Sequence, residues 1–230
     1  MVNPLEKKIA IVTGAGRGVG AAIAHTLATA GACVAVNDLN PDRAEQTASA
    51  IRQAGGQAMG IAADISNKFQ CVHLVESTRQ EWGRLDILVN NAAIRPSSTI
   101  LKMDEWAWQR CLEVNLKGTF FMSQLVGRVM ADENQERGGL IVNIASTAGF
   151  ETALPGRAAY AASKAGVVGF GRECAREFAD HGIRVSTILP EETDNPSAEQ
   201  IAGVVLTLCT HALAPTPDQS ITIDNLRVLH

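Results

Sequence analysis

Short apolar runs alternate with amphipathic segments along most of the chain. The runs are rich in isoleucine and valine, and they are Ile9–Val12, Cys33–Val36, Leu85–Val89, Leu140–Ile144 and Ile183–Leu189. Continuous apolar runs of this length are typical of parallel β-strands that are covered on both faces. The pattern therefore predicts a buried parallel strand at each run.

Segments with helical spacing of apolar residues lie between these runs. Glycine or proline marks their ends. One segment extends from Gly20 to Gly31, the second starts after Pro41 and stops at Gly55 and Gly56, and the third is Asn67–Trp82 before Gly83. Repeated strand–helix units imply a parallel sheet with right-handed crossovers. The predicted fold class is α/β, a single doubly wound parallel sheet with helices on both faces.

Composition narrows the function classes. The chain has 230 residues, is 46% hydrophobic and 19% charged, and carries a formal net charge of −4. The apolar content excludes a disordered chain, and the length favours one domain. The slight acidity and the lack of a Lys/Arg cluster argue against a nucleic-acid partner.

Location and metal binding follow from two further observations. The apolar stretch near the N-terminus, Ile9–Val12, is too short for a signal peptide or a membrane span, so we expect a cytoplasmic protein with no membrane partner. The five cysteines are odd in number and widely spaced. They support neither a disulfide framework nor a metal site.

Glycines follow the first predicted strand directly, in the segment Thr13–Gly20. Without Cβ atoms, a glycine backbone can turn tightly and come close to a pyrophosphate. The following helix adds free N–H groups and the positive end of its dipole. Glycine-rich turns often only end strands, but the place of this one between a buried strand and an alanine-rich helix favours a dinucleotide-binding loop.

Asp38 follows the second apolar run, where a carboxylate can bind the adenosine ribose hydroxyls. The same charge repels a 2′-phosphate, by about 4 kcal/mol for unit charges about 4 Å apart at an effective dielectric near 20. Arg17 has the opposite preference if it pairs with a 2′-phosphate, and it is equally well explained as a solvated loop charge. We predict NAD(H) as the preferred cofactor, with NADP(H) open as the alternative.

Tyr160 and Lys164 are four residues apart, a spacing that places both side chains on one face of a helix. A nearby cation favours the phenolate and lowers the pKa of a tyrosine, which is ordinarily about 10. Tyr160, the only tyrosine of the chain, is therefore a candidate acid/base near neutral pH. An isolated pair of this kind is usually a half-buried aromatic beside a solvated lysine, so the assignment depends on further motifs.

Such motifs occur in order along the chain. They are TGxxxGxG at Thr13–Gly20, NNAA at Asn90–Ala93, Asn115 within Glu113–Gly118, Asn143–Ser146, and YxxxK at Tyr160 and Lys164. Together they resemble the short-chain dehydrogenase/reductase family, 3-oxoacyl-carrier-protein reductases in particular, with Ala93 in place of a glycine. The resemblance implies a Rossmann-type sheet of about seven strands. It also implies one dinucleotide-binding oxidoreductase domain over residues 1–230.

The resemblance implies a role for each matching residue. Tyr160 would exchange a proton with the substrate oxygen, Ser146 would polarise that oxygen, and Lys164 would lower the pKa of Tyr160 and hold the nicotinamide ribose. Asn115 would fix a local helix distortion and a water that links Lys164 to solvent. The implied cofactor-binding residues are Gly14, Arg17, Gly18, Val19, Gly20, Asp38, Asp64, Ile65, Asn91, Ala92, Tyr160, Lys164, Pro190 and Thr193, with Asp64 at the adenine.

The chain departs from the family pattern after the last predicted strand run, Ile183–Leu189. Glu191 replaces a glycine beside the nicotinamide, where it would change the backbone angles and the local field. The family's late helix already begins near Pro196, and residues Ile221–Asp224 resemble the closing strand. The long helical lid that the family usually carries in this part of the chain is therefore almost absent. Lids cover the substrate and exclude water. We therefore expect an open cleft, weak substrate affinity, or a partner subunit that completes the site.

The leading hypothesis is an NAD(H)-dependent oxidoreductase that interconverts a secondary alcohol and a ketone of 3-oxoacyl, polyol or hydroxyacyl type. The alternative is a dinucleotide-binding regulatory or scaffold protein with little turnover, which Glu191 and the missing lid motivate. The resemblance also implies a homodimer or homotetramer built on the helix with Asn115 and the helix with Ala158–Gly169. Arg95, near the cleft, could meet an acidic substrate group, although an exposed loop arginine is more often solvated.

Overall fold

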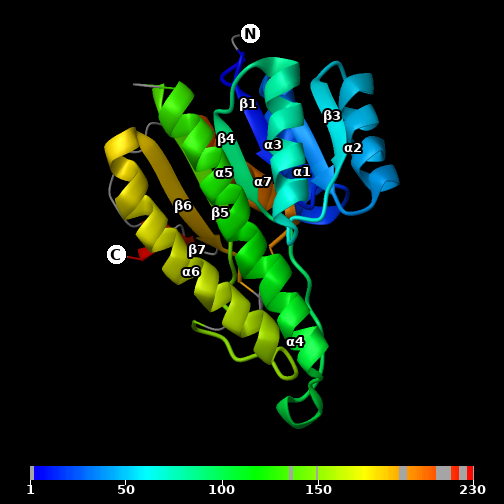
Figure 1. The fold of residues 1–230 in the computed structure, drawn as a ribbon, viewed down its shortest axis with the longest axis vertical. Helices are drawn as coiled ribbons and strands as arrows, with labels where there is room; N and C mark the ends of the chain where they lie inside the picture. Colours follow the sequence, from blue (N-terminus) through cyan, green and yellow to red (C-terminus); the bar gives the residue numbers. More distant parts are fainter. Residues whose placement is uncertain are drawn as a thin grey trace.

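The computed structural model describes residues 3–134, 137–148, 150–191, 196–210, 219–222 and 227–229. Its strands are β1 (Ile9–Val12), β2 (Cys33–Asp38), β3 (Gln57–Ala62), β4 (Ile87–Asn90), β5 (Gly139–Ile144), β6 (Ile183–Leu189), β7 (Gln219–Thr222) and β8 (Arg227–Leu229). Within the described residues they form one sheet in the order β3-β2-β1-β4-β5-β6-β7-β8 (Figure 1). Strands β1 to β7 are parallel, and β8 pairs antiparallel with β7.

Helices cover both faces of the sheet. One layer contains α1 (Gly18–Thr29), α2 (Pro41–Gln53) and α7 (Ala198–Thr210), and the other contains α3 (Lys68–Trp82), α5 (Gly118–Glu133) and α6 (Ala158–Phe178). Helix α4 (Glu105–Leu112) and a π-helix (Glu113–Lys117) lead into α5 and extend beyond the sheet (Figure 1). The predicted doubly wound parallel sheet is confirmed, and β8 adds one antiparallel strand.

Successive residues of the central strands supply the two core layers in turn. In β1, Ala10 and Val12 pack with α1 and α7, whereas Ile9 and Ile11 pack with α3 and α5. All four residues are buried. Because each face needs apolar side chains, such a strand has a continuous apolar sequence instead of an alternating one.

The hydrophobic pattern does not predict β3. Among the strands that the structure describes, it pairs only with β2, so it lies at an edge of the sheet. Its ends, Gln57 and Ala62, are exposed, and in its interior a Cβ on Gly60 would lie 2.9 Å from the backbone of α2. The edge position and the close approach of the helix explain a strand with few large apolar residues.

The ends of the predicted helices shift by a few residues. Helix α2 begins at Pro41 itself, just before the predicted start, and Asn40 caps it by accepting a hydrogen bond from the Arg43 N–H at 3.0 Å. Helix α1 begins at Gly18, two residues before the predicted start at Gly20. The predicted closing strand at residues 221–224 overlaps β7 at residues 221–222, and residues 223–224 lie outside the described residues.

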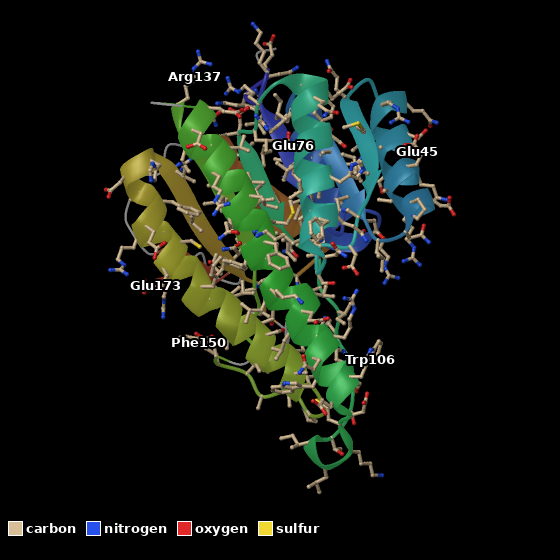
Figure 2. All side chains as sticks on the ribbon, in the orientation of Figure 1. Glu45, Glu76, Trp106, Arg137, Phe150 and Glu173 are labelled. Atoms are coloured by element: carbon tan, nitrogen blue, oxygen red, sulfur yellow. The ribbon has the colours of Figure 1, made fainter. Side chains whose placement is uncertain are left out.

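Exposed apolar side chains gather at the end of the molecule that α4 occupies. Trp106 is 72% exposed and Phe150 is 52% exposed, and both project outward (Figure 2). Ile100 and Leu101, on the short 3-10 turn before α4, are also exposed.

Among the described residues, no helix has both the length and the apolar character needed to cross a lipid bilayer.

Candidate active site

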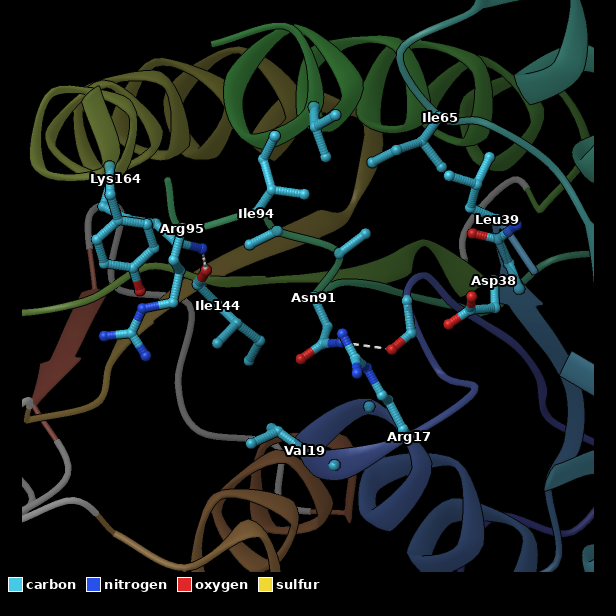
Figure 3. Close-up of a pocket in the computed structure, with 18 of the residues that line it drawn as sticks. Arg17, Val19, Asp38, Leu39, Ile65, Asn91, Ile94, Arg95, Ile144 and Lys164 are labelled. Atoms are coloured by element: carbon cyan, nitrogen blue, oxygen red, sulfur yellow. Dashed lines mark hydrogen bonds between the residues drawn. The ribbon is translucent and has the colours of Figure 1, made fainter. Parts of the chain in front are cut away.

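A cavity of about 640 Å³ lies at the carboxyl ends of the parallel strands. It opens where the strand order reverses, between β1 and β4, which is the usual ligand position in a doubly wound sheet. Asp38 and Leu39 lie at one end of it, and Arg95 and Lys164 lie at the other (Figure 3). Its volume is within the range of small-molecule sites.

The glycine loop forms one wall of the cavity. Gly14 has a φ of +61°, and a Cβ there would lie 2.7 Å from the Ala92 Cα atom. A Cβ on Gly20 would lie 2.4 Å from the Gly14 carbonyl oxygen. Gly18 also has a positive φ, of +56°, but no described atom lies within 4 Å of its Cβ position. The first two glycines are therefore required by close packing, and Gly18 leaves open space beside the helix.

Strand β4 holds this loop in place. The Asn91 side-chain amide donates hydrogen bonds to the carbonyl oxygens of Thr13, at 2.9 Å, and Gly14, at 3.1 Å (Figure 3). In return, the Thr13 hydroxyl accepts hydrogen bonds from the N–H groups of Asn91 and Ala92. The loop conformation thus depends on residues almost eighty positions further along the chain.

The N-terminus of α1 faces the cavity with its N–H groups unused by any described side-chain cap. Its first turn contains no acidic residue, and Gly18, Val19 and Gly20 line the cavity. Free N–H groups and a positive dipole end bind anions such as a pyrophosphate. The space at Gly18 and these donors fit a dinucleotide.

Asp38 lies at the opposite end of the cavity from Lys164 (Figure 3). Its carboxylate accepts hydrogen bonds from the N–H groups of Gly16, at 3.2 Å, and Asn40, at 2.9 Å. Two arginines, Arg17 and Arg43, also line the cavity. The sequence analysis missed Arg43, because its place on α2 reveals proximity to the glycine loop only after folding.

Asp64 belongs to a charged network on the cavity wall. Its carboxylate accepts hydrogen bonds from the Ser66 N–H and hydroxyl, at 2.9 and 2.7 Å, and from Arg110 at 2.8 Å. Burial alone would raise the pKa of Asp64, but these hydrogen bonds and the charge of Arg110 hold it below its ordinary value. Arg110, which comes from α4, is a further lining residue that the sequence analysis missed.

Tyr160 and Lys164 lie one turn apart on α6, as their spacing predicts, and both line the cavity. They are only 5% and 4% exposed. The Lys164 ammonium group donates a hydrogen bond to the Ile144 carbonyl oxygen at 2.5 Å and lies 5.8 Å from the centre of the Tyr160 ring. A buried cation fixed this close to a phenol favours its ionised form.

Ser146 and Asn115 are buried, and neither is part of the cavity lining. The Ser146 hydroxyl accepts a hydrogen bond from the Ala148 N–H at 3.0 Å. Asn115 lies in the π-helix Glu113–Lys117, the local distortion that was expected there. The Asn115 amide donates to the Ser163 hydroxyl at 2.9 Å, and Ser163 in turn donates to the Tyr160 carbonyl oxygen at 2.7 Å.

Most of the predicted cofactor-binding residues line this one cavity. They are Gly14, Arg17, Gly18, Val19, Gly20, Asp38, Asp64, Ile65, Asn91, Ala92, Tyr160, Lys164 and Pro190. Thr193 lies outside the described residues. Glu191, which replaces the expected glycine, also lines the cavity.

Comparisons with known proteins agree with this arrangement. A family model described as short chain dehydrogenase matches residues 8–203. A 3-oxoacyl-[acyl-carrier-protein] reductase from Synechocystis sp. is 36% identical over 87% of this chain and 82% of its own length. A D-threitol dehydrogenase from Mycolicibacterium smegmatis is 41% identical over 81% of this chain and 70% of its own length. A crystal structure assigned to a short-chain alcohol dehydrogenase from Sinorhizobium meliloti 1021 has a TM-score of 0.89 at 33% identity, covering 97% of both chains.

Proposed function

The chain belongs to the short-chain dehydrogenase family, and from this membership we propose that it interconverts a secondary alcohol and a ketone with NAD(H). One observation carries the proposal: the glycine loop, Asp38, Tyr160 and Lys164 line the same cavity. A dinucleotide whose phosphates lie at the loop therefore has room to extend from Asp38 toward Tyr160. When bound, the nicotinamide supplies or accepts the hydride.

Tyr160 moves the proton in this proposal. During reduction its hydroxyl donates a proton to the carbonyl oxygen of the substrate, which leaves a phenolate; during oxidation the phenolate takes the proton of the alcohol. Lys164, held by the Ile144 carbonyl oxygen, stabilises the phenolate through its charge. Ser146 donates a hydrogen bond to the same substrate oxygen and stabilises its developing charge.

Asn115 is a positioning residue in this scheme. Its amide links the loop residue Ile94 to Ser163, which binds the main chain of Tyr160. The π-helix directs the Asn115 side chain inward to make these contacts. Asn115 thus fixes the turn of α6 from which Tyr160 acts, and we propose that it also holds a water that leads from Lys164 to solvent.

Tyr160→Phe tests the acid/base role. The variant keeps the ring that packs in the small cluster with Cys111 and Ala159 but lacks the hydroxyl. We expect turnover to fall by about 100- to 10,000-fold, whereas the dissociation constant of NADH, measured by fluorescence titration, changes little. Turnover equal to that of the wild type would contradict the proposal.

The substrate assignment is a ketone or alcohol of 3-oxoacyl, polyol or hydroxyacyl type. The names of the related reductase and threitol dehydrogenase support the first two classes. A panel of such ketones with NADH, and of the matching alcohols with NAD⁺, tests it. Glu191 on the cavity wall favours a second candidate, a dinucleotide-binding regulatory protein with little turnover. Tight NADH binding without oxidation by any member of the panel would support this second candidate.

We also propose that the chain forms a homodimer or homotetramer through the outer face of α5 and α6. An apolar hollow on this face is lined by Phe120, Phe170 and Phe178. Phe120 is 38% exposed, and its ring packs edge-on against Phe170, 6.1 Å from centre to centre. Phe120→Ser should shift the molar mass measured by light scattering toward the monomer; an unchanged mass would argue against this interface.

A cytoplasmic location is proposed on the state of the thiols. Each of the five cysteines is free, and three of them are buried. Unpaired cysteines are typical of a reducing compartment. Fractionation of the source cells with an antibody against the chain tests this assignment.

A further inference from the structure

Arg95 lies at the substrate end of the cavity, outside the motifs that bind the cofactor. Its guanidinium carbon is 4.6 Å from the centre of the Tyr160 ring. The side chain points into the cavity that Tyr160 and Lys164 also line (Figure 3). The group proposed to exchange the proton therefore has a permanently charged guanidinium beside it.

The main chain at Arg95 is held from two sides. Asn115 accepts a hydrogen bond from the Ile94 N–H at 2.8 Å and donates one to the Ile94 carbonyl oxygen at 3.0 Å. Arg157 donates a hydrogen bond to the Arg95 carbonyl oxygen. The segment thus has a fixed position relative to α6, and the Arg95 side chain starts from a defined point beside Tyr160.

The charges around this end of the cavity favour an anion. Arg95 and Lys164 are both cations near the ring, at 4.6 and 5.8 Å from its centre. Asp64, also on the cavity wall, is paired with Arg110. Glu191 is a further acidic residue of the cavity lining, and it can compete with an anionic ligand for Arg95.

We propose that Arg95 determines substrate specificity by binding a carboxylate that lies one or two carbons from the reacting carbonyl. The inference rests on the proposed alcohol–ketone activity and narrows its substrate to a short oxo acid and the corresponding hydroxy acid. A guanidinium can bind a carboxylate through two parallel hydrogen bonds. With Arg95 against the ring of Tyr160, only a short spacer lets one molecule reach both the guanidinium and the phenol.

The test compares oxo acids with their methyl esters, which keep the carbonyl and lose the charge. For the wild type we expect kcat/KM to be about 10- to 100-fold higher for the acid, since a charged hydrogen bond contributes about 1.5–3 kcal/mol. In Arg95→Met, the ratio of kcat/KM for the acid to kcat/KM for the ester should be close to one. Arg95→Lys, which keeps the charge but not the paired donors, should give an intermediate ratio. Lys102→Met removes an exposed cation outside the cavity lining and should leave the ratio unchanged.

The outcomes separate this inference from the proposed function. If the wild type reduces acids and esters equally well and Arg95→Met leaves that ratio unchanged, Arg95 does not select the substrate, and the alcohol–ketone activity stands. If the wild type reduces no carbonyl compound, the proposed function itself is wrong. A direct binding test supports the inference independently: calorimetric titration of the NAD⁺-saturated enzyme with malonate should show binding that Arg95→Met weakens about 10-fold or more.

Discussion

At the scale of a single residue, we propose that Asp38 determines the choice between NAD(H) and NADP(H). Its carboxylate lies at one end of the cavity, which Arg17 and Arg43 also line (Figure 3). A negative charge there repels a 2′-phosphate, whereas the arginines attract it. One substitution at Asp38 should therefore change the balance between repulsion and attraction of a 2′-phosphate.

We predict that Asp38→Asn raises the affinity for NADPH relative to NADH by about 10-fold or more, because the repulsive charge is lost and the arginines remain. Fluorescence titration with both cofactors measures the change. Asp42→Asn, on the exposed first turn of α2, is the matched control and should leave the ratio unaltered. Tighter binding of NADPH than NADH by the wild type would contradict the assignment of NAD(H).

Asp64 should contribute to stability in a pH-dependent way. Its pKa is held below the ordinary value, so its contribution is present above about pH 4 and is lost as the pH falls through its lowered pKa. Asp64→Asn should therefore reduce the loss in the free energy of unfolding between about pH 4 and pH 2. Urea unfolding across this range measures the slope. The same slope in Asp64→Asn and in the exposed control Asp132→Asn would show that the Arg110 pair contributes nothing.

At the scale of elements, buried strands could be predicted from the sequence, and contacts between distant segments could not. Strand β1 is apolar throughout because both of its faces are covered, so the hydrophobic pattern reveals it. Strand β3 pairs on one side only, and Gly60 admits the backbone of α2, so its pattern is weak. The proximity of Tyr160 and Lys164 could be predicted from the sequence because the two residues are only four positions apart.

The contacts of Arg43 and Arg110 with the cavity could not be predicted in the same way. Each lies on a helix whose distance from the glycine loop or from Asp64 is set by packing across the sheet. Neither residue type is unusual on a helix, so the sequence carries no local signal for them. The three-dimensional packing of the helices on the sheet is what brings these two arginines to the cavity.

Gly14→Ala tests the glycine loop as an element. The residue has a positive φ, and the new Cβ would lie 2.7 Å from the Ala92 backbone, so the loop or β4 has to move. We predict a destabilisation of about 1–3 kcal/mol and a loss of NADH binding. Gly203→Ala, in the middle of α7 with no described atom near its Cβ position, should instead stabilise by about 0.5–1 kcal/mol. Normal NADH affinity in Gly14→Ala would contradict the proposed role of the loop.

At the scale of the whole molecule, cofactor binding should stabilise the fold. The cavity draws its walls from β2 and β5, from the segments that follow β1 and β4, and from helices on both faces, so a ligand there bridges many elements. NADH at 100 times its dissociation constant should add about 2.7 kcal/mol to the free energy of unfolding. For a chain of this size, the expected rise in Tm is about 5–10 °C. Differential scanning calorimetry measures the change in Tm. An unchanged Tm would contradict the binding of NADH in this cavity.

The mutual hydrogen bonds between Thr13 and Asn91 have a consequence for biosynthesis. While the ribosome is still translating the first hundred codons, the emerging polypeptide already displays every glycine of the motif, yet it lacks the partner that shapes them. Dinucleotide affinity should therefore not arise before Asn91 and Ala92 clear the exit tunnel. A gene fragment that encodes only the amino-terminal motif would carry the signature of a binding module without its capacity to bind.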